Sequence, residues 1–329
     1  MAMAVTRNEV AREAGVSPAV VSYVLNDGPR PVSVAARTRV LDAVARLGYR
    51  PDGLARSLRV GRTHTIGLVV PDATNPFFAE LARAIEDAAY RRRYAVLVCN
   101  SADDLERERS YIENLAERRI DGLILVSAVE DQDVSGLTGL SIPVVALDRS
   151  PDEVPISTIR TQNEHAAYIG TSHLIEHGHR EIGLIAGPGR GVSDDRAAGW
   201  RRALAEHGLS EGPIARGEFS FDGGHEAARR LLEIGIPFTA ALAASDVQAV
   251  GAASAFRAGG LAVPNGVALV SIDGTEASAY MNPPLTTVAQ AIGPMADAAV
   301  QHLIDKPTEV IHWTFDNELV VRESCGCTP

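Results

Sequence analysis

The strongest constraint on how this chain folds is a pair of short helices, separated by a glycine, close to the N-terminus. The first helix has three apolar residues at helical spacing, Val10, Ala11 and Ala14. We expect it to end at Gly15. Ser17 can then cap a second helix that begins at Pro18, where the missing N–H had no partner to lose. The second helix has an inward apolar stripe formed by Val20, Val21, Val24 and Leu25.

Two short helices joined by a glycine-containing turn are typical of a helix-turn-helix, whose second helix lies in the major groove of DNA. Four residues of that helix would face outward, Pro18, Ala19, Ser22 and Tyr23. A third helix over residues 33–47 would close a three-helix core with the apolar residues Val34, Val40, Leu41, Val44 and Leu47. We therefore expect a DNA-binding domain over residues 1–50; a protein–protein module of three amphipathic helices is the alternative.

The distribution of charge favours the DNA-binding interpretation. Residues 1–62 hold ten arginines and five acidic residues, a net charge of +5. The whole chain carries −11, so residues 63–329 carry −16. A basic head on an acidic body is typical of a DNA-binding domain joined to a partner domain that does not contact phosphate.

From residue 63 the pattern changes to short apolar strands that alternate with longer amphipathic helices. The first set has expected strands at 65–70, 95–99, 122–126 and 143–147, with helices at 76–92 and 104–118. The second set has helices at 163–177, 194–206, 222–234 and 246–257, with strands at 181–186, 214–219, 240–244 and 267–272. This α/β alternation predicts two doubly wound parallel sheets, with a ligand cleft beyond the carboxyl ends of their strands.

Patterns that resemble catalytic motifs are incomplete. His173, Glu176 and His177 spell the H-x-x-E-H arrangement of a zinc peptidase, but Gly178 ends that helix at once. A phosphate-binding loop needs Gly-Lys-Ser/Thr, and the only lysine is Lys306, which follows an aspartate. No Gly-x-Ser-x-Gly elbow is present. We expect no catalytic residues, no metal and no cofactor, and keep a metal hydrolase as a minor alternative.

The three cysteines give no disulfide framework. Cys325 and Cys327 form a Cys-x-Cys pair without a second Cys/His pair near it in the sequence, so we expect incidental reduced thiols. The first residues hold no apolar run of the signal-peptide type, and no stretch of 18 apolar residues could span a bilayer. These features predict a cytoplasmic protein.

Five segments carry a resemblance to a known family: VAREAGVSPAVVSYVLN, LGYRPDGLARSLR, TIGLVVPDATNPFFAEL, HLIEHGHREIGLIAGP and PPLTTVAQ. Together they resemble the lactose/galactose-repressor family of bacterial transcription regulators over about residues 4–324. The resemblance implies a homodimer or tetramer that reads a palindromic operator, with DNA affinity controlled by a small effector. It also implies that residues 51–62 form a hinge helix, although by themselves they read as a linker.

The resemblance implies DNA contacts from eleven residues. They are Thr6, Ser17, Pro18, Ala19, Ser22, Tyr23, Asn26, Arg30, Ala55, Arg56 and Leu58. Leu58 is the expected minor-groove wedge that kinks the duplex. Tyr23 replaces the Arg or His that is frequent in the family, and Pro18 and Ala19 have no side-chain donor, so Arg-to-guanine readout is excluded at these positions.

The resemblance also implies an effector site between two subdomains that are similar to periplasmic binding proteins. Its expected residues are Asp72, Asn75, Phe77, Asp148, Arg196, Phe219, Ser245, Asp246, Asp273 and Gln290. The expected subdomains are residues 63–160 plus 291–320 and residues 161–290 plus 321–329. A sugar is favoured as effector, with a nucleobase or nucleoside as the alternative. A transport-type sugar-binding receptor is the alternative function, against which the basic head and the absent signal peptide argue.

Overall fold

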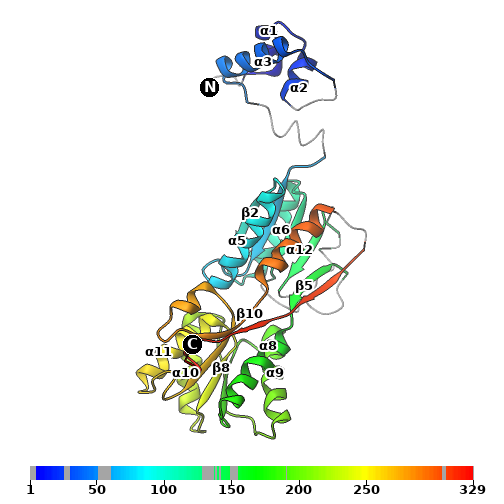
Figure 1. Ribbon diagram of the computed structural model, residues 1–329. Helices are drawn as coiled ribbons and strands as arrows, with labels where there is room; N and C mark the ends of the chain where they lie inside the picture. The colour runs from blue at the N-terminus through cyan, green and yellow to red at the C-terminus, as the bar shows by residue number, and fades with distance from the viewer. Residues whose placement is uncertain are drawn as a thin grey trace. The chain divides into compact units, whose positions relative to one another are not determined.

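The computed structural model describes residues 5–25, 30–50, 61–127, 137, 139–140, 142–148, 155–189, 191–305 and 309–328. The chain forms two compact units, residues 1–63 and 64–329. The first unit is the basic head, and the second contains two sheets flanked by helices (Figure 1). Among the described helices, none combines the length and the apolar composition that crossing a bilayer requires.

The head contains three helices, α1 (Arg7–Ala14), α2 (Pro18–Leu25) and α3 (Val34–Leu47). Helix α1 begins with a capping box in which Thr6 and Glu9 exchange hydrogen bonds, and it ends at Gly15 with φ 61°. The Oγ of Ser17 accepts from the backbone N of Val20 (3.4 Å), as a cap for α2 requires. Buried residues from all three helices form the core, Val10, Ala11, Ala14, Val21, Val24, Val40 and Ala43.

Two residues of the expected head core lie outside it. Val34 is 82% exposed and Leu41 is 46% exposed. Helix α3 turns Val40 and Ala43 toward α1 and α2, so Leu41, one residue on from Val40, points away. Val34 is the first residue of α3 and projects beyond the packed part of the helix.

The first sheet of the large unit is parallel throughout, in the order β11-β5-β4-β3-β1-β2. Its strands are β1 (Thr65–Val70), β2 (Ala95–Asn100), β3 (Gly122–Leu125), β4 (Val144–Leu147), β5 (Ser157–Thr161) and β11 (His312–Phe315). Its helices are α5 (Pro76–Arg91), α6 (Leu105–Glu117) and α12 (Ile292–Asp305). Helices α5 and α12 pack in one core with β1, and α6 packs in another.

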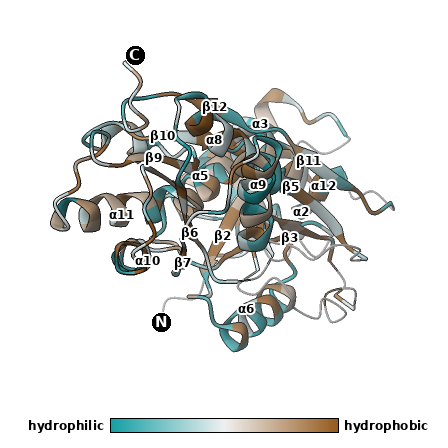
Figure 2. Cartoon of the chain, turned by 90° about the horizontal axis from the view of Figure 1, so that it is seen from below, coloured by the Kyte–Doolittle hydropathy of each residue, from teal (hydrophilic) through white to brown (hydrophobic). Residues whose placement is uncertain are grey.

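The second sheet has the order β12-β10-β9-β8-β6-β7, with β12 antiparallel to β10 and the other pairs parallel. Its strands are β6 (Ile182–Ala186), β7 (Ile214–Arg216), β8 (Ala240–Ala243), β9 (Ala268–Asp273), β10 (Thr286–Ala289) and β12 (Glu318–Val320). Its helices are α8 (Asn163–Glu176), α9 (Val192–Glu206), α10 (Phe221–Glu233) and α11 (Asp246–Ala258), with a short 3-10 helix, η1 (Glu276–Tyr280). Figure 2 shows predominantly apolar strands beside helices with hydrophilic outer residues, the pattern of a sheet covered on both faces.

The chain crosses between the two sheets three times, and two of the crossings are bonded together. The amide of Gln162 donates to the carboxylate of Asp316, and Nδ2 of Asn317 donates to Oγ1 of Thr161 (2.6 Å). The remaining crossing contains Gln290, between β10 and α12. The sequence predicted that the chain returns to the second subdomain at residue 321. In the structure it returns three residues earlier, because β12 (residues 318–320) already pairs with β10.

Candidate functional site

A small cavity of about 20 Å³ lies between the two sheets of the large unit. This volume holds about one water molecule, so a ligand of the size of a sugar requires the two halves of the unit to move apart. Its lining comes from residues that follow or flank the carboxyl ends of strands in both sheets. The lining residues are Asn75, Phe77, Phe78, Asp148, Val192, Arg196, Phe219, Ser245, Asp273 and Gln290. The cavity therefore combines apolar walls with charged and amide groups.

The centre of the polar lining is a buried pair formed by Arg196 and Asp273. Nη1 of Arg196 lies 3.5 Å from Oδ1 of Asp273, and each side chain is about 5% exposed or less. Arg196 also donates through Nε to Oδ1 of Asn163 (2.9 Å) and through Nη1 to the carbonyl of Ala244. Among the described residues, its Nη2 has no hydrogen-bond partner. The guanidinium is thus held on one side and keeps a donor for a ligand.

The second member of this pair has an unusual protonation equilibrium. Burial raises the pKa of Asp273 to about 7, against the opposing effect of the Arg196 charge, and nearby Asp246 raises it further. Its Oδ1 also accepts from Nε2 of Gln290 (3.0 Å). The Oε1 of Gln290 is buried and has no hydrogen-bond partner among the described residues. A ligand donor in the cavity would satisfy this acceptor.

Both acidic residues at strand ends of the cavity have strained backbones. Asp148, after β4, has φ 65°, and Asp273, at the end of β9, has φ 129°. Residues other than glycine rarely adopt such angles, and they gather at functional sites where the surrounding structure enforces them. The strain gives an indication of function that is independent of the charges.

Two aromatic rings and one asparagine close the cavity across the two sheets. The guanidinium of Arg196 lies 5.9 Å from the centre of the Phe219 ring, and Phe77 is buried on the opposite side. Asn75 donates through Nδ2 to the carbonyl of Phe219 (3.3 Å), while its Oδ1 caps α5 by accepting from the N of Phe77 (3.0 Å). A second bridge joins the sheets where the backbone N of Glu276 donates to Glu80 (2.8 Å).

Eight of the ten expected effector residues line the cavity, and Asp246 and Asp72 do not. The carboxylate of Asp246 is occupied by protein donors, namely the hydroxyls of Ser271, Thr275 and Thr287 and the N–H of Thr275. The carboxylate of Asp72 accepts from the N and Oγ1 of Thr74 in its own turn. In both residues the carboxylate holds the local backbone or neighbouring hydroxyls, and contact of either with an effector stays a prediction.

Two positioning residues escaped the sequence analysis. Asn163, the first residue of α8, holds Nε of Arg196. Gln248 is fully buried in α11 and donates to the carbonyls of Gly217 and Glu218, which fixes the loop before Phe219. A polar side chain on the inward face of a predicted helix was the available signal in the case of Gln248.

In the head, four of the expected DNA-contacting residues line one groove, Ser17, Ala19, Tyr23 and Arg30. Pro18 lies beside them as the first, exposed residue of α2, and Ser22 is half-buried in the same helix. Thr6 caps α1 through Glu9, so its side chain has a structural role. The expected contacts Asn26, Ala55, Arg56 and Leu58 lie outside the described residues.

Both units match known families. Residues 6–52 match the family described as "Bacterial regulatory proteins, lacI family". Residues 63–313 match the family described as "Periplasmic binding proteins and sugar binding domain of LacI family". The two matches lie in the head and in the large unit, respectively.

Full-length relatives and a solved structure agree with these matches. The chain is 34% identical over 328 residues to the HTH-type transcriptional repressor PurR of Aliivibrio salmonicida, covering 97% of this chain and 98% of the relative. It is 34% identical over 309 residues to the ribose operon repressor of Escherichia coli K12, covering 92% of this chain and 93% of that relative. A crystal structure of the Lac repressor dimer bound to operator and the anti-inducer ONPF superposes with a TM-score of 0.89, at 30% identity over 98% of this chain and 99% of that one.

Proposed function

Because the chain belongs to the lacI family of bacterial regulatory proteins, we propose that it is a transcriptional repressor whose operator affinity is controlled by a small effector. The observation that carries the proposal is the joining, in one chain, of a helix-turn-helix unit to a unit with a polar cavity between two sheets. The head binds a palindromic operator, and the cavity binds the effector. The protein acts in the cytoplasm and has no catalytic activity.

The chemistry of the cavity supports a small polyhydroxylated effector. A buried guanidinium beside two carboxylates, Asp148 and Asp273, can donate to and accept from vicinal hydroxyl groups. The Phe219 ring offers an apolar face for the ring carbons of a sugar. The hydroxyl-binding groups and the aromatic face together favour a monosaccharide, with a nucleobase or nucleoside as the alternative.

A homodimer supplies the two heads that a palindromic operator needs. The support in this chain is an apolar edge of the first sheet. Leu97 and Val98 are neighbours in β2 and point to opposite faces of the strand, yet they are 41% and 51% exposed. Tyr90 of α5 is 80% exposed. We propose that these three side chains contact a second copy of the chain.

DNA binding is tested by the salt dependence of binding to a fluorescent random-sequence duplex. The basic head predicts affinity that falls steeply with salt, because released counterions drive binding to phosphate. A full-length chain that binds no duplex at any ionic strength contradicts the repressor and supports the sugar-receptor alternative.

The hinge is tested by Leu58→Ala, which we expect to weaken binding to a selected specific site far more than binding to random DNA. The specific duplex comes from rounds of selection with the wild-type protein. Equal losses on both duplexes would remove the wedge role from Leu58.

The effector is tested by thermal denaturation in the presence of sugars and nucleosides, one at a time. A compound that binds only the folded protein raises the melting temperature, and the stabilisation grows with the logarithm of one plus its concentration divided by Kd. The compound that does so must then change operator affinity. A hit that stabilises the protein without changing operator affinity contradicts control by that compound.

A further inference from the structure

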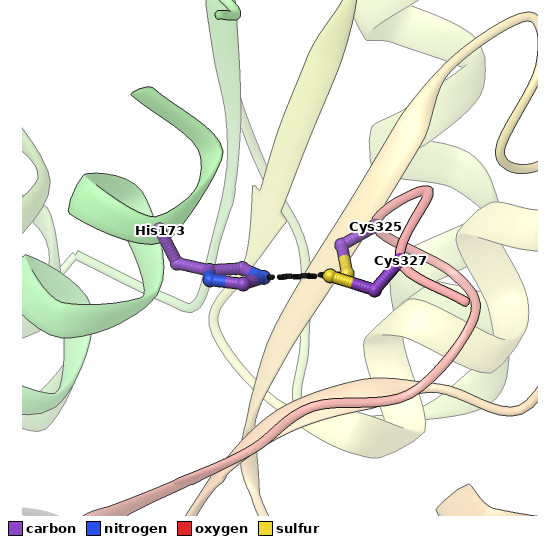
Figure 3. A group of neighbouring side chains, drawn as sticks. All are labelled: His173, Cys325 and Cys327. Carbon is purple, nitrogen blue, oxygen red and sulfur yellow. Dashed lines mark hydrogen bonds between the residues drawn. The ribbon is translucent and has the colours of Figure 1, made fainter. Parts of the chain in front are cut away.

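The C-terminal tail folds back onto helix α8 and brings two cysteines beside two histidines. His173 lies in the last turn of α8 and His177 follows the helix directly. Cys325 and Cys327 lie about 150 residues further along the chain, in the turn after β12. Figure 3 shows the His173 ring pointing between the two sulfur atoms. The sequence spacing gave no sign of this cluster, because its two halves are adjacent only in the fold.

The distances within the cluster match those between the ligands of one metal ion. Nε2 of His173 lies 3.3 Å from Sγ of Cys325 and 3.8 Å from Sγ of Cys327. Nε2 of His177 lies 3.2 Å from Sγ of Cys327. In a tetrahedral zinc site, Zn–S of about 2.3 Å and Zn–N of about 2.0–2.1 Å separate nitrogen from sulfur by about 3.6 Å. The ligand atoms of His173, Cys325 and Cys327 all lie within 4.8 Å of one another. His177 is close to Sγ of Cys327 but does not belong to that group, so its side chain must turn toward the ion to complete a tetrahedral shell.

The chain is shaped to present both thiols to one point. Gly326, between the two cysteines, has φ 94°, an angle that a side chain would oppose, and it lets the tail reverse direction. Ser324 ties the turn to the second sheet, with Oγ donating to the carbonyl of Leu269 (2.6 Å) and accepting from the N of Thr286 (2.8 Å). The turn is therefore fixed before any ion binds.

A second layer of contacts supports the sulfur of Cys325. Oγ1 of Thr286 in β10 lies 3.1 Å from this sulfur and 3.0 Å from the carbonyl of Arg322, and its single proton can be donated to either acceptor. Cys325 is 2% exposed and His173 is 8% exposed, while Cys327 is half-buried and His177 is exposed. The cluster therefore has a buried side, made by Cys325 and His173, and an open side through which an ion can enter. Hydrogen bonds to ligating sulfur atoms are a usual part of metal sites.

From this geometry we propose that Cys325, Cys327, His173 and His177 bind one zinc-class divalent cation. Two thiolates and two imidazoles are a donor set of structural zinc sites, and the soft thiolates select against magnesium and calcium. Once the exposed His177 turns toward the ion, four protein ligands close the coordination shell, so the ion is structural and has no open position for catalysis. Binding releases the thiol protons and clamps the C-terminal tail onto α8.

This proposal is separate from the H-x-x-E-H pattern and from the effector cavity. Glu176 is exposed and is not part of the cluster. The effector cavity contacts the opposite end of α8, where Asn163 holds Arg196. The 14 residues of α8 separate the two places by about 20 Å.

The test is a titration of the reduced, chelator-treated full-length protein with cobalt(II) alone. We expect the visible absorption of tetrahedral cobalt and a thiolate-to-cobalt charge-transfer band, both saturating at one ion per chain. Zinc added afterwards should bleach both bands, and competition with a chromogenic chelator then gives the zinc affinity.

Matched variants identify the ligands. Cys327→Ser and His177→Asn change the accessible side of the cluster, and each should lower zinc affinity by at least about 100-fold. Thr286→Val should lower it by about 10-fold, as loss of an outer contact does. Cys99→Ser in β2 and His165→Gln in α8 lie outside the cluster and should leave the affinity unchanged. Circular dichroism checks that each variant is folded.

Three results would overturn the proposal. The first is the absence of a charge-transfer band while both thiols titrate as free. The second is an unchanged band in folded Cys327→Ser. The third is equal loss of affinity in the control variants, which marks non-specific binding. DNA binding and effector binding are measured separately, so their failure would not be confused with failure here.

Discussion

The two sheets of the large unit have the same strand order but carry different chemistry. From one edge, they read β2-β1-β3-β4-β5-β11 and β7-β6-β8-β9-β10-β12. The first sheet and its helices expose an apolar edge at β2 and give the cavity Asn75, Phe77 and Asp148. The second sheet gives it Arg196, Phe219 and Asp273.

Two sheets of one architecture are thus proposed to serve two tasks, anchoring the ligand and contacting a second copy of the chain. The polar groups with the most extensive protein contacts belong to the second sheet, so we propose that half as the anchor for a ligand. The first half contributes aromatic walls, one asparagine and the carboxylate of Asp148, and it carries the surface proposed for the second copy of the chain. In the proposed repressor, a ligand held by the second half and covered by the first would connect effector binding to the spacing of the two heads. Four predictions test this division of labour.

The largest effect is expected from Arg196→Ala. Truncating one member of a buried charge pair costs roughly 2–5 kcal/mol of binding, so effector affinity should fall by at least about 30-fold. Operator affinity should stay near wild type. Calorimetric titration with the identified effector measures the effector affinity, and fluorescence anisotropy with the operator duplex measures the operator affinity. Loss of operator binding in a folded variant would instead give Arg196 a structural role.

The next effect concerns the first sheet. The double variant Leu97→Asp and Val98→Asp puts charge on the exposed β2 edge, where it cannot be buried against a second copy. We expect a monomer in analytical ultracentrifugation and operator affinity lower by about 10-fold or more. The matched control is Val321→Asp, which charges a residue of similar exposure after β12. If the double variant is still a dimer, the exposed edge of β2 is not the interface between the two copies.

A smaller effect is the pH dependence of stability that comes from Asp273. Burial raises its pKa from 3.8 to about 7, so the folded protein holds this proton more tightly than the unfolded chain. Its contribution to the free energy of unfolding is therefore greatest below about pH 4, falls as pH rises to about 7, and is level above. Within that window the slope approaches about 1.4 kcal/mol per pH unit.

Urea denaturation of wild type and Asp273→Asn across pH 4–8 measures this contribution. The difference between the two proteins should change with pH up to about pH 7 and then become constant. A difference independent of pH would show that Asp273 has an ordinary pKa.

The smallest effect is expected from Glu80→Gln, which weakens one bridge between the sheets. The carboxylate accepts from the N of Glu276 (2.8 Å), and an amide oxygen accepts the same bond less strongly. We expect effector affinity to change by about threefold or less, as measured by calorimetric titration. A loss of effector affinity as large as that of Arg196→Ala would show that the hydrogen bond between Glu276 and Glu80 matters as much as Arg196. The proposal that the second sheet alone anchors the ligand would then be wrong.

The sequence was informative wherever a local rule decides the structure. The head helices follow from their caps and from Gly15, and most of the cavity follows from polar residues that come directly after apolar strands. Features that depend on residues distant in the chain could not be predicted from local patterns. Asp246 is an example: its position at a strand end gave no sign that the hydroxyls of Ser271 and Thr287 donate to its carboxylate.

The cysteine cluster illustrates the same limit. The Cys-x-Cys pair appeared isolated because its histidine neighbours stand 150 residues earlier, and only the antiparallel return of β12 brings the tail to α8. The head core was overestimated at Leu41 for a related reason. Apolar spacing marks a helix face, but packing against α1 and α2 decides which side of the helix is covered.

The three crossings between the sheets restrict how the two halves can move. Three short connections in parallel oppose both separation and twisting, and leave rotation about the line of the crossings as the soft movement. Gln290 lies on the connection between β10 and α12 and also lines the cavity. A molecule that engages its vacant Oε1 is thus attached at the pivot, where a contact fixes the angle of opening without travelling with either half.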